Sequence, residues 1–335
     1  MRVSVVCPVF NTRPDDLRAA VASALAELEA EGGEILLVDD HSTSEETKAA
    51  LDELARLESV RLLRTDTNGG AARARNLGLS EARSDWVGFL DADDLWPEGK
   101  LDRARAALAA RPATAWIFGD NASINQQNFL EHIPVSPELL QQTGEEAPEV
   151  VCAPALTHWI LLTGLSLGTC LIRREQLGED RRFAPEVVYG EDLVFLAKLS
   201  VAACATYAAG PAYTFRRQRT SLMWSARRLT RDYASGPRAA MRDAELRPYR
   251  RFCRWWLYGV LKDLAANNLV NGRRRLGLGF ALQALWVDPR EVGEFISFLR
   301  LLGLSGAPDM ADRARRYSRR EIVQLDQIER GNPAS

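Results

Sequence analysis

Two hydrophobic patterns alternate along the first 120 residues of the chain. Short apolar runs rich in Val, Ile and Leu are typical of strands buried in a parallel sheet. Between these runs, apolar residues recur at every third or fourth position, which is typical of helices that pack on one face. Strands are predicted at residues 3–9, 35–38, 60–63, 86–90 and 116–118. This alternation predicts an α/β fold in which helices cover both faces of a mainly parallel sheet.

The segments between the predicted strands carry helix start signals. Thr12 can cap a helix after the first strand, and Ser42 with Glu45 matches a capping box for the next one. The leucines of this second helix that are spaced to face the core are Leu51, Leu54 and Leu57. Further helices are predicted over residues 71–82 and 97–110.

The pattern changes after residue 120. Residues 126–154 are polar, contain proline and lack periodicity, which predicts a loop or insertion. A strand at 165–173 and a helix at 192–203 follow. From about residue 227 the chain is helical and rich in arginine, so we expect residues 226–335 to form a helical C-terminal region. Its last 25 residues are strongly charged and are expected to fray.

Polar clusters stand where four of the predicted strands end. They are residues 8–11, 39–42, 68–70 and 91–94. Because ligands of open parallel sheets bind beyond the carboxyl ends of the strands, we expect the four clusters to form one site. In the last cluster, Asp91 and Asp93 can aim two carboxylates at one point, and hard oxygen ligands suit Mg²⁺ or Mn²⁺. The alternative is a solvated acidic turn in which Asp91 or Asp94 caps a helix.

These clusters carry a resemblance to a known family. PVFN, VDDHS, NGGAARARNLG and FLDADDLW, in this order and spacing, resemble the nucleotide-binding half of glycosyltransferase family 2, which has the GT-A fold. LSLGTCLIRRE, YGEDLVF and FRRQRTSLMW resemble its acceptor half. The resemblance implies a GT-A domain over residues 1–225, with a nucleotide-sugar half (1–120) and an acceptor half (121–225) around a Rossmann-like mixed sheet. It also implies inverting transfer of a sugar from a nucleotide sugar to a hydroxyl of an acceptor glycan.

The resemblance also assigns residues to the donor. Asp39 would accept a hydrogen bond from the imide N–H of uracil, which favours a UDP-sugar. Mn²⁺ or Mg²⁺ on Asp91 and Asp93 would bridge the donor diphosphate. The predicted nucleotide-sugar residues are Pro8, Phe10, Asn11, Asp39, Asp40, Asn68, Gly69, Arg75, Asp91, Ala92, Arg216 and Arg219. The alternatives are that Asp39 or Asp40 only caps the next helix, and that Arg75 is an ordinary surface arginine.

The acceptor side is assigned in the same way. The resemblance implies that Asp192 is the catalytic base, with Glu191 and Trp224 on the acceptor side. The alternative is a helix N-terminus that carries two acids because the helix dipole favours them. Gln218 stands where many relatives carry a histidine, which puts a third protein ligand to the metal in doubt.

Charge changes the picture for the C-terminal region. The net charge of the chain is −2, yet twelve arginines fall between residues 216 and 254. They adjoin the apolar, tryptophan-rich segment RWWLYGVL at residues 254–261. One interpretation is contact with an anionic membrane surface, which would suit a lipid-linked oligosaccharide acceptor in bacterial surface polysaccharide synthesis. The other is that the arginines pair with acids of the first domain while the apolar residues form the helical region's own core.

The cysteines and the apolar segments bear on location. Cys7, Cys152, Cys170, Cys204 and Cys253 are odd in number and lack metal or disulfide spacing, so we expect buried thiols in a reducing compartment. The N-terminus is typical of a strand rather than a signal peptide, and no apolar stretch reaches 18 uncharged residues. We therefore expect a cytoplasmic protein, and contact at the inner face of the cell membrane stays open.

Other classes fit the sequence less well. Neither GxGxxG nor GxxxxGK[ST] occurs, which disfavours a dehydrogenase and a P-loop nucleotidase. A nucleotidyltransferase of similar fold is the nearest alternative, although PVFN does not resemble its glycine-rich basic loop. The arginines at 216–254 could also bind nucleic acid, but a pI of 6.1 and the absence of RNA-binding motifs argue against nucleic acid as a partner.

Overall fold

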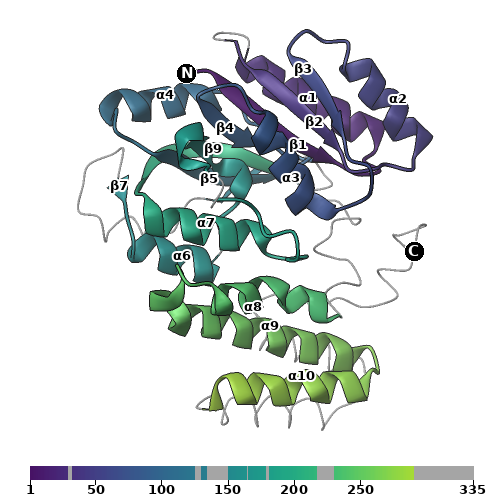
Figure 1. Ribbon diagram of the computed structural model, residues 1–335, viewed down its shortest axis with the longest axis vertical. Coiled ribbons are helices and arrows are strands. Elements are labelled where there is room, and N and C mark those ends of the chain that lie inside the picture. The colour runs from purple at the N-terminus through teal and green to yellow at the C-terminus, as the bar shows by residue number, and fades with distance from the viewer. Residues whose placement is uncertain are drawn as a thin grey trace. The chain divides into compact units, whose positions relative to one another are not determined.

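The computed structural model describes the backbone of residues 130–133 and 163 and, in full, residues 1–28, 32–124, 150–162, 165–178, 181–216 and 230–289. The chain divides into two compact units (Figure 1). Unit 1 comprises Met1–Pro185 and Glu191–Arg217, and unit 2 comprises Glu186–Gly190 and Gln218–Ser335. The boundary predicted between residues 225 and 226 lies outside the described residues.

Unit 1 is built on one mixed sheet of order β3-β2-β1-β4-β8-β5-β9-β7, with β6 paired to β5. The strands are β1 (Val3–Val9), β2 (Glu34–Asp39), β3 (Val60–Arg64), β4 (Trp86–Phe89), β5 (Trp116–Ile124), β6 (Leu130–Ile133), β7 (Val150–Val151), β8 (Leu171–Arg173) and β9 (Ala205–Arg216). The parallel pairs are β1 with β2, β1 with β4, β2 with β3, and β5 with β9. Strand β8 runs antiparallel between β4 and β5. The predicted mixed α/β sheet is confirmed.

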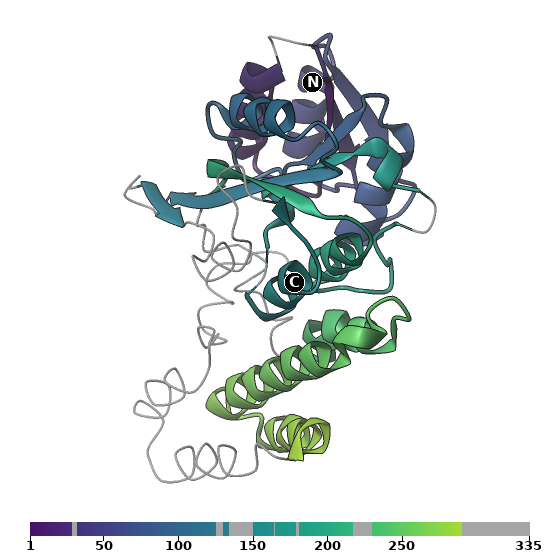
Figure 2. The same cartoon turned by 90° about the vertical axis from the view of Figure 1, so that its left-hand side faces the viewer.

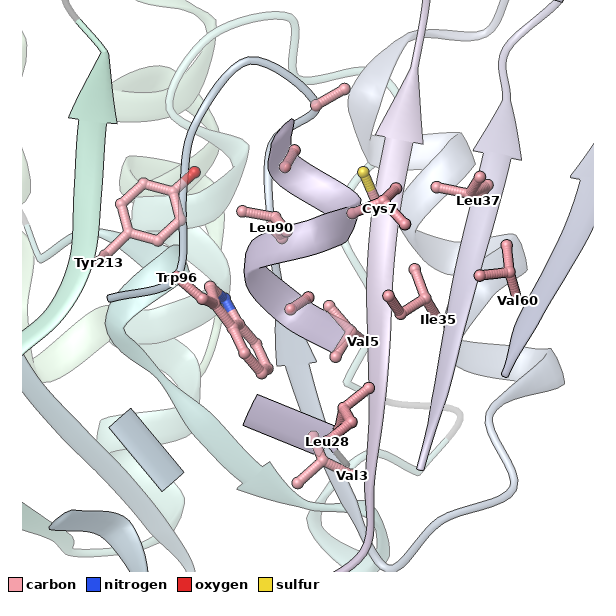
Figure 3. Packing of buried hydrophobic residues seen from close by; sticks show 14 of the residues in the cluster. Val3, Val5, Cys7, Leu28, Ile35, Leu37, Val60, Leu90, Trp96 and Tyr213 are labelled. Atoms are coloured by element: carbon pink, nitrogen blue, oxygen red, sulfur yellow. The ribbon is translucent and has the colours of Figure 1, made fainter. Parts of the chain in front are cut away.

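Helices cover both faces of this sheet (Figure 1). They are α1 (Pro14–Leu28), α2 (Glu45–Leu54), α3 (Gly70–Glu81), α4 (Lys100–Ala110), α6 (Ala155–Thr163) and α7 (Glu191–Ala202). On one face, Val5 and Cys7 of β1 pack with Ile35 of β2 in the main hydrophobic core (Figure 3). On the other face, Val6 meets Gly78 of α3. A Cβ at Gly78 would lie 2.4 Å from Cγ1 of Val6, so glycine is what allows α3 to approach β1.

The sheet register brings the predicted site to one edge. Val9 of β1 pairs with Asp39 of β2, and Asp39 pairs with Arg64 of β3. Strand β4 ends close to the same level, because its Phe89 pairs with Val6. The loops after these parallel strands therefore start side by side, as predicted.

Two helix boundaries differ from the sequence prediction. Helix α2 is capped by Ser44, whose side chain accepts a hydrogen bond from the N–H of Thr47, so the capping box at Ser42 was wrong. The helix ends at Leu54, which leaves Leu57 outside it and exposed rather than facing the core. Helix α4 starts at Lys100 instead of residue 97, because Gly99 has a left-handed backbone (φ 73°) that interrupts the helical turn.

The segments after residue 120 contain more strand than predicted. Residues 126–154, predicted as a loop, include β6 and β7. The strand predicted at 165–173 is limited to β8, after a short 3₁₀ turn at Leu167–Thr169. Both β6 and β7 are only two to four residues long, too short to show a period.

A disulfide also corrects the cysteine prediction. Cys152 and Cys204 are bonded and exposed, while Cys7, Cys170 and Cys253 are buried free thiols. Strand β7 pairs antiparallel with β9 through Val151 and Ala205, which sets the two cysteines opposite each other just beyond this pair. Their separation of 52 residues gave no sign of this pairing.

Unit 2 contains α8 (Ser235–Arg242), α9 (Arg250–Val270) and α10 (Arg274–Val287). Helices α9 and α10 form an antiparallel hairpin and lie side by side in both views (Figures 1 and 2). Trp256, Leu257 and Tyr258 are buried, so the apolar segment 254–261 mainly builds the core of this unit. No helix in the described part of the chain is both long and apolar enough to cross a membrane. The predicted fraying of the last 25 residues lies outside the described ranges.

Candidate active site

Residues 91–94, which we call the aspartate loop, follow β4 at the edge where β1 and β2 end. The loop closes through a 3.0 Å hydrogen bond from the N–H of Asp94 to the carbonyl of Asp91. Tyr213 of β9 braces it at both ends. The tyrosine hydroxyl accepts from the N–H of Asp91 at 3.1 Å and donates to the carboxylate of Asp94 at 2.9 Å. A strand far along the chain thus fixes the orientation of the loop.

Arg216, at the end of β9, holds the aspartate loop from the other side. Its N–H donates to the Asp94 carboxylate, and its Nε donates to the carbonyl of Asp93, both at 2.8 Å. Its Nη2 donates to the carbonyl of Asp16 at 2.8 Å, and its Nη1 pairs with the Asp16 carboxylate at 3.3 Å. Arg216 therefore stabilises the loop in this arrangement, and its contact with a diphosphate stays a prediction.

The aspartate loop concentrates negative charge. Burial, and then the charge of Asp91, raises the pKa of Asp93 to about 6. Burial, and then the charges of Asp93 and Asp91, raises the pKa of Asp94 to about 8. Carboxylates that repel one another at a strand end form an environment that favours a bound cation.

The brace on this loop can be tested with Tyr213→Phe, which removes the hydroxyl and keeps the ring. We expect a loss of about 1 kcal/mol in stability. Mn²⁺-dependent binding of UDP should also weaken by about tenfold or more, because a residue that orients a metal ligand is lost. The measurement is calorimetric titration of UDP with Mn²⁺.

Tyr207→Phe is the matched control for Tyr213→Phe. Tyr207 lies on the same strand, and its hydroxyl donates to the buried Asp120 at 2.7 Å, away from the aspartate loop. It should lose similar stability and bind UDP normally. Equal UDP affinities for the two variants would show that Tyr213 does not position the loop.

Arg75 joins the two halves of the site. It lies on α3 and is buried, with Nη2 donating to Asp91 at 2.9 Å and Nη1 donating to Glu191 at 2.6 Å. Its Nε is buried without a hydrogen-bond partner in the structure. The interpretation of Arg75 as an ordinary surface arginine is wrong.

The neighbouring Asn76 fastens the same helix to the acceptor half. Its side-chain amide donates to the carbonyl of Phe183 at 2.8 Å and accepts from the N–H of Phe183 at 2.9 Å. The Phe183 ring stacks on Phe195 of α7 with centroids 4.2 Å apart, and Phe89 of β4 packs edge-on against both rings. This packing fixes the helix that begins at Glu191. The motif NGGAARARNLG contains Asn76, but the sequence assigned this residue no role.

Asp192 stands beside Glu191 at the N-terminus of α7. Burial, and then the charge of Glu191, raises the pKa of Asp192 to about 7, while Arg75 opposes the rise. The charge of Asp91 also acts on Asp192. A carboxylate whose pKa lies near neutrality can accept a proton from a hydroxyl and release it again.

The donor-side loops are held by two buried aspartates. Asp39 accepts from the N–H of Ser42 at 2.9 Å, and its other oxygen lies 3.7 Å from Nε of Arg64. Asp40 accepts from the N–H groups of Gly69 and Gly70 at 2.6–3.1 Å, at the start of α3. Asp40 thus anchors the turn at 68–70, and its direct contact with a nucleotide stays a prediction.

Asn11 connects the loops after β1 and β2. Its side-chain oxygen accepts from the N–H groups of Thr43 and Ser44 at 2.8 and 2.9 Å. Asn11 has φ 50°, a left-handed conformation that asparagine tolerates. Phe10 beside it is 48% exposed, which leaves its ring free to stack on a base.

The remaining predicted residues divide into two groups. Pro8 is the next-to-last residue of β1, Asn68 donates to the carbonyl of Asp40 at 3.1 Å, and Ala92 is buried in the aspartate loop. Arg219 and Trp224 lie outside the described residues, as does Gln218. Nothing in the structure therefore tests the roles predicted for them.

The described side chains fit a metal ion whose remaining coordination positions are filled by the bound diphosphate and water. They include no group of three or more His, Cys, Asp or Glu residues placed to hold an ion. Asp91 and Asp93 alone supply two carboxylates, and the Asp91 side chain is 45% exposed. Two protein oxygens suit Mg²⁺ or Mn²⁺ where diphosphate and water supply the other ligands.

The mixed sheet, with the aspartate loop after β4, defines a domain of the GT-A class. Staphylococcus aureus TarS 1–349, solved in complex with UDP-GlcNAc, shares this fold with a TM-score of 0.61 and 20% identity, over 95% of this chain and 90% of that one. The model of glycosyl transferase family 2 matches residues 4–156. This part of the chain is therefore similar to that family, as its motifs predicted.

Two curated relatives have related activities or pathways in their names. The succinoglycan biosynthesis protein ExoW of Rhizobium meliloti (strain 1021) is 32% identical over 209 residues, 58% of this chain and 62% of ExoW. The UDP-Glc:alpha-D-GlcNAc-diphosphoundecaprenol beta-1,3-glucosyltransferase WfgD of Escherichia coli is 29% identical over 128 residues, 38% of this chain and 49% of WfgD. The chain spans less than two thirds of the length of the curated relatives it matches first.

Proposed function

We propose that the protein is an inverting glycosyltransferase that uses a UDP-sugar and a divalent metal. The observation that carries the proposal is the Arg75 bridge. It brings Asp91, at the predicted donor and metal site, together with Glu191 and so with the neighbouring Asp192. A cation site next to a carboxylate that titrates near neutrality is what a single displacement at a sugar carbon needs.

The donor and the acceptor class rest on the site and the relatives together. Asp39 supplies a carboxylate acceptor at the strand end where the uracil imide would lie, and TarS and WfgD are named with uridine donors. ExoW is named for a bacterial polysaccharide, and WfgD for a diphosphoundecaprenol-linked acceptor. We therefore assign a growing surface glycan, carried on a lipid diphosphate, as the acceptor.

The chain's own residues perform the following steps. Asp91 and Asp93 would hold the metal, and a bound metal would neutralise charge on the departing diphosphate. Arg75 orients Asp91 and Glu191 through its two Nη groups. Asp192 takes the proton of the acceptor hydroxyl while that oxygen bonds to the anomeric carbon from the face opposite the leaving UDP. One such displacement inverts the anomeric centre.

The proposal is tested by measuring nucleotide release from a panel of uridine, guanosine and thymidine diphosphate sugars, with Mn²⁺ and with EDTA. We expect slow hydrolysis of a UDP-sugar that requires metal. Asp39→Asn should raise KM for that donor by about tenfold or more, because a charged hydrogen bond to uracil is lost.

Asp52→Asn is the control for Asp39→Asn. Asp52 also pairs with Arg64, at 2.5 Å, but it lies on the exposed side of α2. Its KM should match the wild type. Turnover of no UDP-sugar, or equal turnover with and without metal, would rule the proposed donor chemistry out.

A further inference from the structure

The outer face of α10 carries an unusual concentration of exposed apolar side chains. Seven large apolar side chains are exposed among the described residues, and four of them lie on this one helix. Leu278, Leu282 and Trp286 follow one another at intervals of four residues and are 49%, 67% and 86% exposed. This spacing sets the three side chains in one stripe, which spans roughly 12 Å along the helix axis.

The stripe is not part of the core of unit 2. The buried residues of α10 are Gly277, Phe280, Ala281 and Ala284, on the side of the helix that packs on α9. Gly277 permits this packing, because a Cβ there would lie 2.5 Å from Cγ of Leu269 on α9. Helical geometry places Trp286 opposite this buried side. Apolar side chains so exposed on a helix are typical of a binding surface.

The unit that carries the stripe has a net positive charge. The described residues of unit 2 carry eleven Arg and Lys side chains against six Asp and Glu. Helix α10 begins with the exposed Arg274 and Arg275 and has no acidic residue in its first turn. The helix dipole favours acids at this end, so the two arginines oppose the stability of the helix. An anionic partner at this end would offset that cost.

A second group of arginines borders α10. Arg238 of α8 donates from Nη2 to Oε1 of Gln283 at 2.9 Å, and Gln283 follows the exposed Leu282 in the helix. Burial, and then repulsion from Arg231 and Arg242, lowers the pKa of Arg238. These three arginines are therefore close enough to repel one another, which an anionic surface would relieve.

We propose that the outer face of α10 binds the surface of an anionic lipid bilayer. Leu278, Leu282 and Trp286 would enter the headgroup boundary, while Arg274 and Arg275 contact lipid phosphates. A second copy of the chain is a poorer occupant, because two such faces carry the same positive charge. Nucleic acid would use the arginines but leave the leucine stripe in water.

The surface differs from the one that the sequence suggested. The segment 254–261 was the expected lipid contact, but its apolar residues Trp256, Leu257 and Tyr258 are buried. The exposed apolar residues instead lie one helix later, on α10. The inference does not depend on the proposed glycosyl transfer, because binding to lipid needs neither donor nor metal.

The test is co-sedimentation of the full chain with vesicles of phosphatidylcholine alone and of phosphatidylcholine mixed with phosphatidylglycerol, without donor. We expect binding to the mixed vesicles only, weakened by high salt. Leu282→Ala with Trp286→Ala should reduce this binding by about tenfold or more, because the inserted apolar surface is lost. Arg274→Glu with Arg275→Glu should reduce it by a similar factor.

Matched controls lie in unit 1. Leu57→Ala removes an exposed leucine, and Arg83→Glu reverses an exposed arginine, both far from α10 in the sequence. Both should bind vesicles like the wild type, and circular dichroism should show all variants folded. Three outcomes would overturn the proposal: no binding to the mixed vesicles, undiminished binding by the α10 variants, or a wild-type dimer in solution that the Leu282 and Trp286 changes dissociate.

Discussion

Asp192→Asn is expected to lower kcat by about 10²–10⁴-fold, the usual contribution of a general base, with donor affinity close to that of the wild type. Asparagine keeps the shape of the side chain and can still accept the hydrogen bond that the N–H of Leu193 makes at 2.8 Å. It cannot take a proton from the acceptor hydroxyl. Steady-state transfer and calorimetric UDP titration separate the two effects.

The dependence of kcat on pH provides a second test of the role of Asp192 as the base. Because the pKa of Asp192 is about 7, the wild-type kcat should rise as pH increases through 7 and level off above it. The residual activity of Asp192→Asn should lose this rise. Asp102→Asn is the control for an acid in the first turn of a helix away from the site, here α4, where Asp102 pairs with Arg105. If Asp192→Asn transferred sugar at the wild-type rate, Asp192 would only serve the N-terminus of its helix and the base would lie elsewhere.

Asp93→Asn is expected to weaken UDP binding in Mn²⁺ by at least about tenfold and to remove the difference between Mn²⁺ and EDTA. The change takes away one of two carboxylates that can hold the cation. The change also removes a negative charge that repels the Asp94 carboxylate and raises its pKa. The variant should therefore not be destabilised by charge repulsion within the loop. Titration of UDP into wild type and variant, each with Mn²⁺ and with EDTA, measures the effect.

Asp85→Asn makes the same charge change before the start of β4, at the opposite end of the strand, where the side chain is exposed. Its UDP binding should keep the full metal dependence. Metal-independent binding by the wild type would remove Asp91 and Asp93 from any role in holding a cation.

Periodicity predicted the elements that are long or buried on one side. Strand β1 was found because it is a continuous apolar run, and helix α1 because its apolar positions recur at helical spacing. Strands β6 and β7 escaped detection because each is short and is recognised only by its pairing partner. The same holds for the disulfide, since Cys152 and Cys204 meet only once β7 lies beside β9. Ser42 and Ser44 both precede acids, and local sequence could not decide which one caps α2.

The site was predictable where chemistry and motif coincide. Asp91 and Asp93 were expected after β4, and the structure places them there. The partners of Arg75 were not predictable, because Glu191 follows it by 116 residues and the helix that carries Glu191 is placed by aromatic packing. Tyr213 gave no signal, since a tyrosine in a strand is ordinary until its hydroxyl is seen on the aspartate loop.

The Arg75 bridge makes the two substrates of the proposed enzyme cooperative ligands. One buried guanidinium donates hydrogen bonds to both Asp91 and Glu191. A ligand that changes the strength of the hydrogen bond to one carboxylate therefore changes the strength of the other. Thermodynamic linkage then requires that the donor alter acceptor affinity by the same factor by which the acceptor alters donor affinity. Any coupling between donor and acceptor affinity would therefore pass through this one side chain.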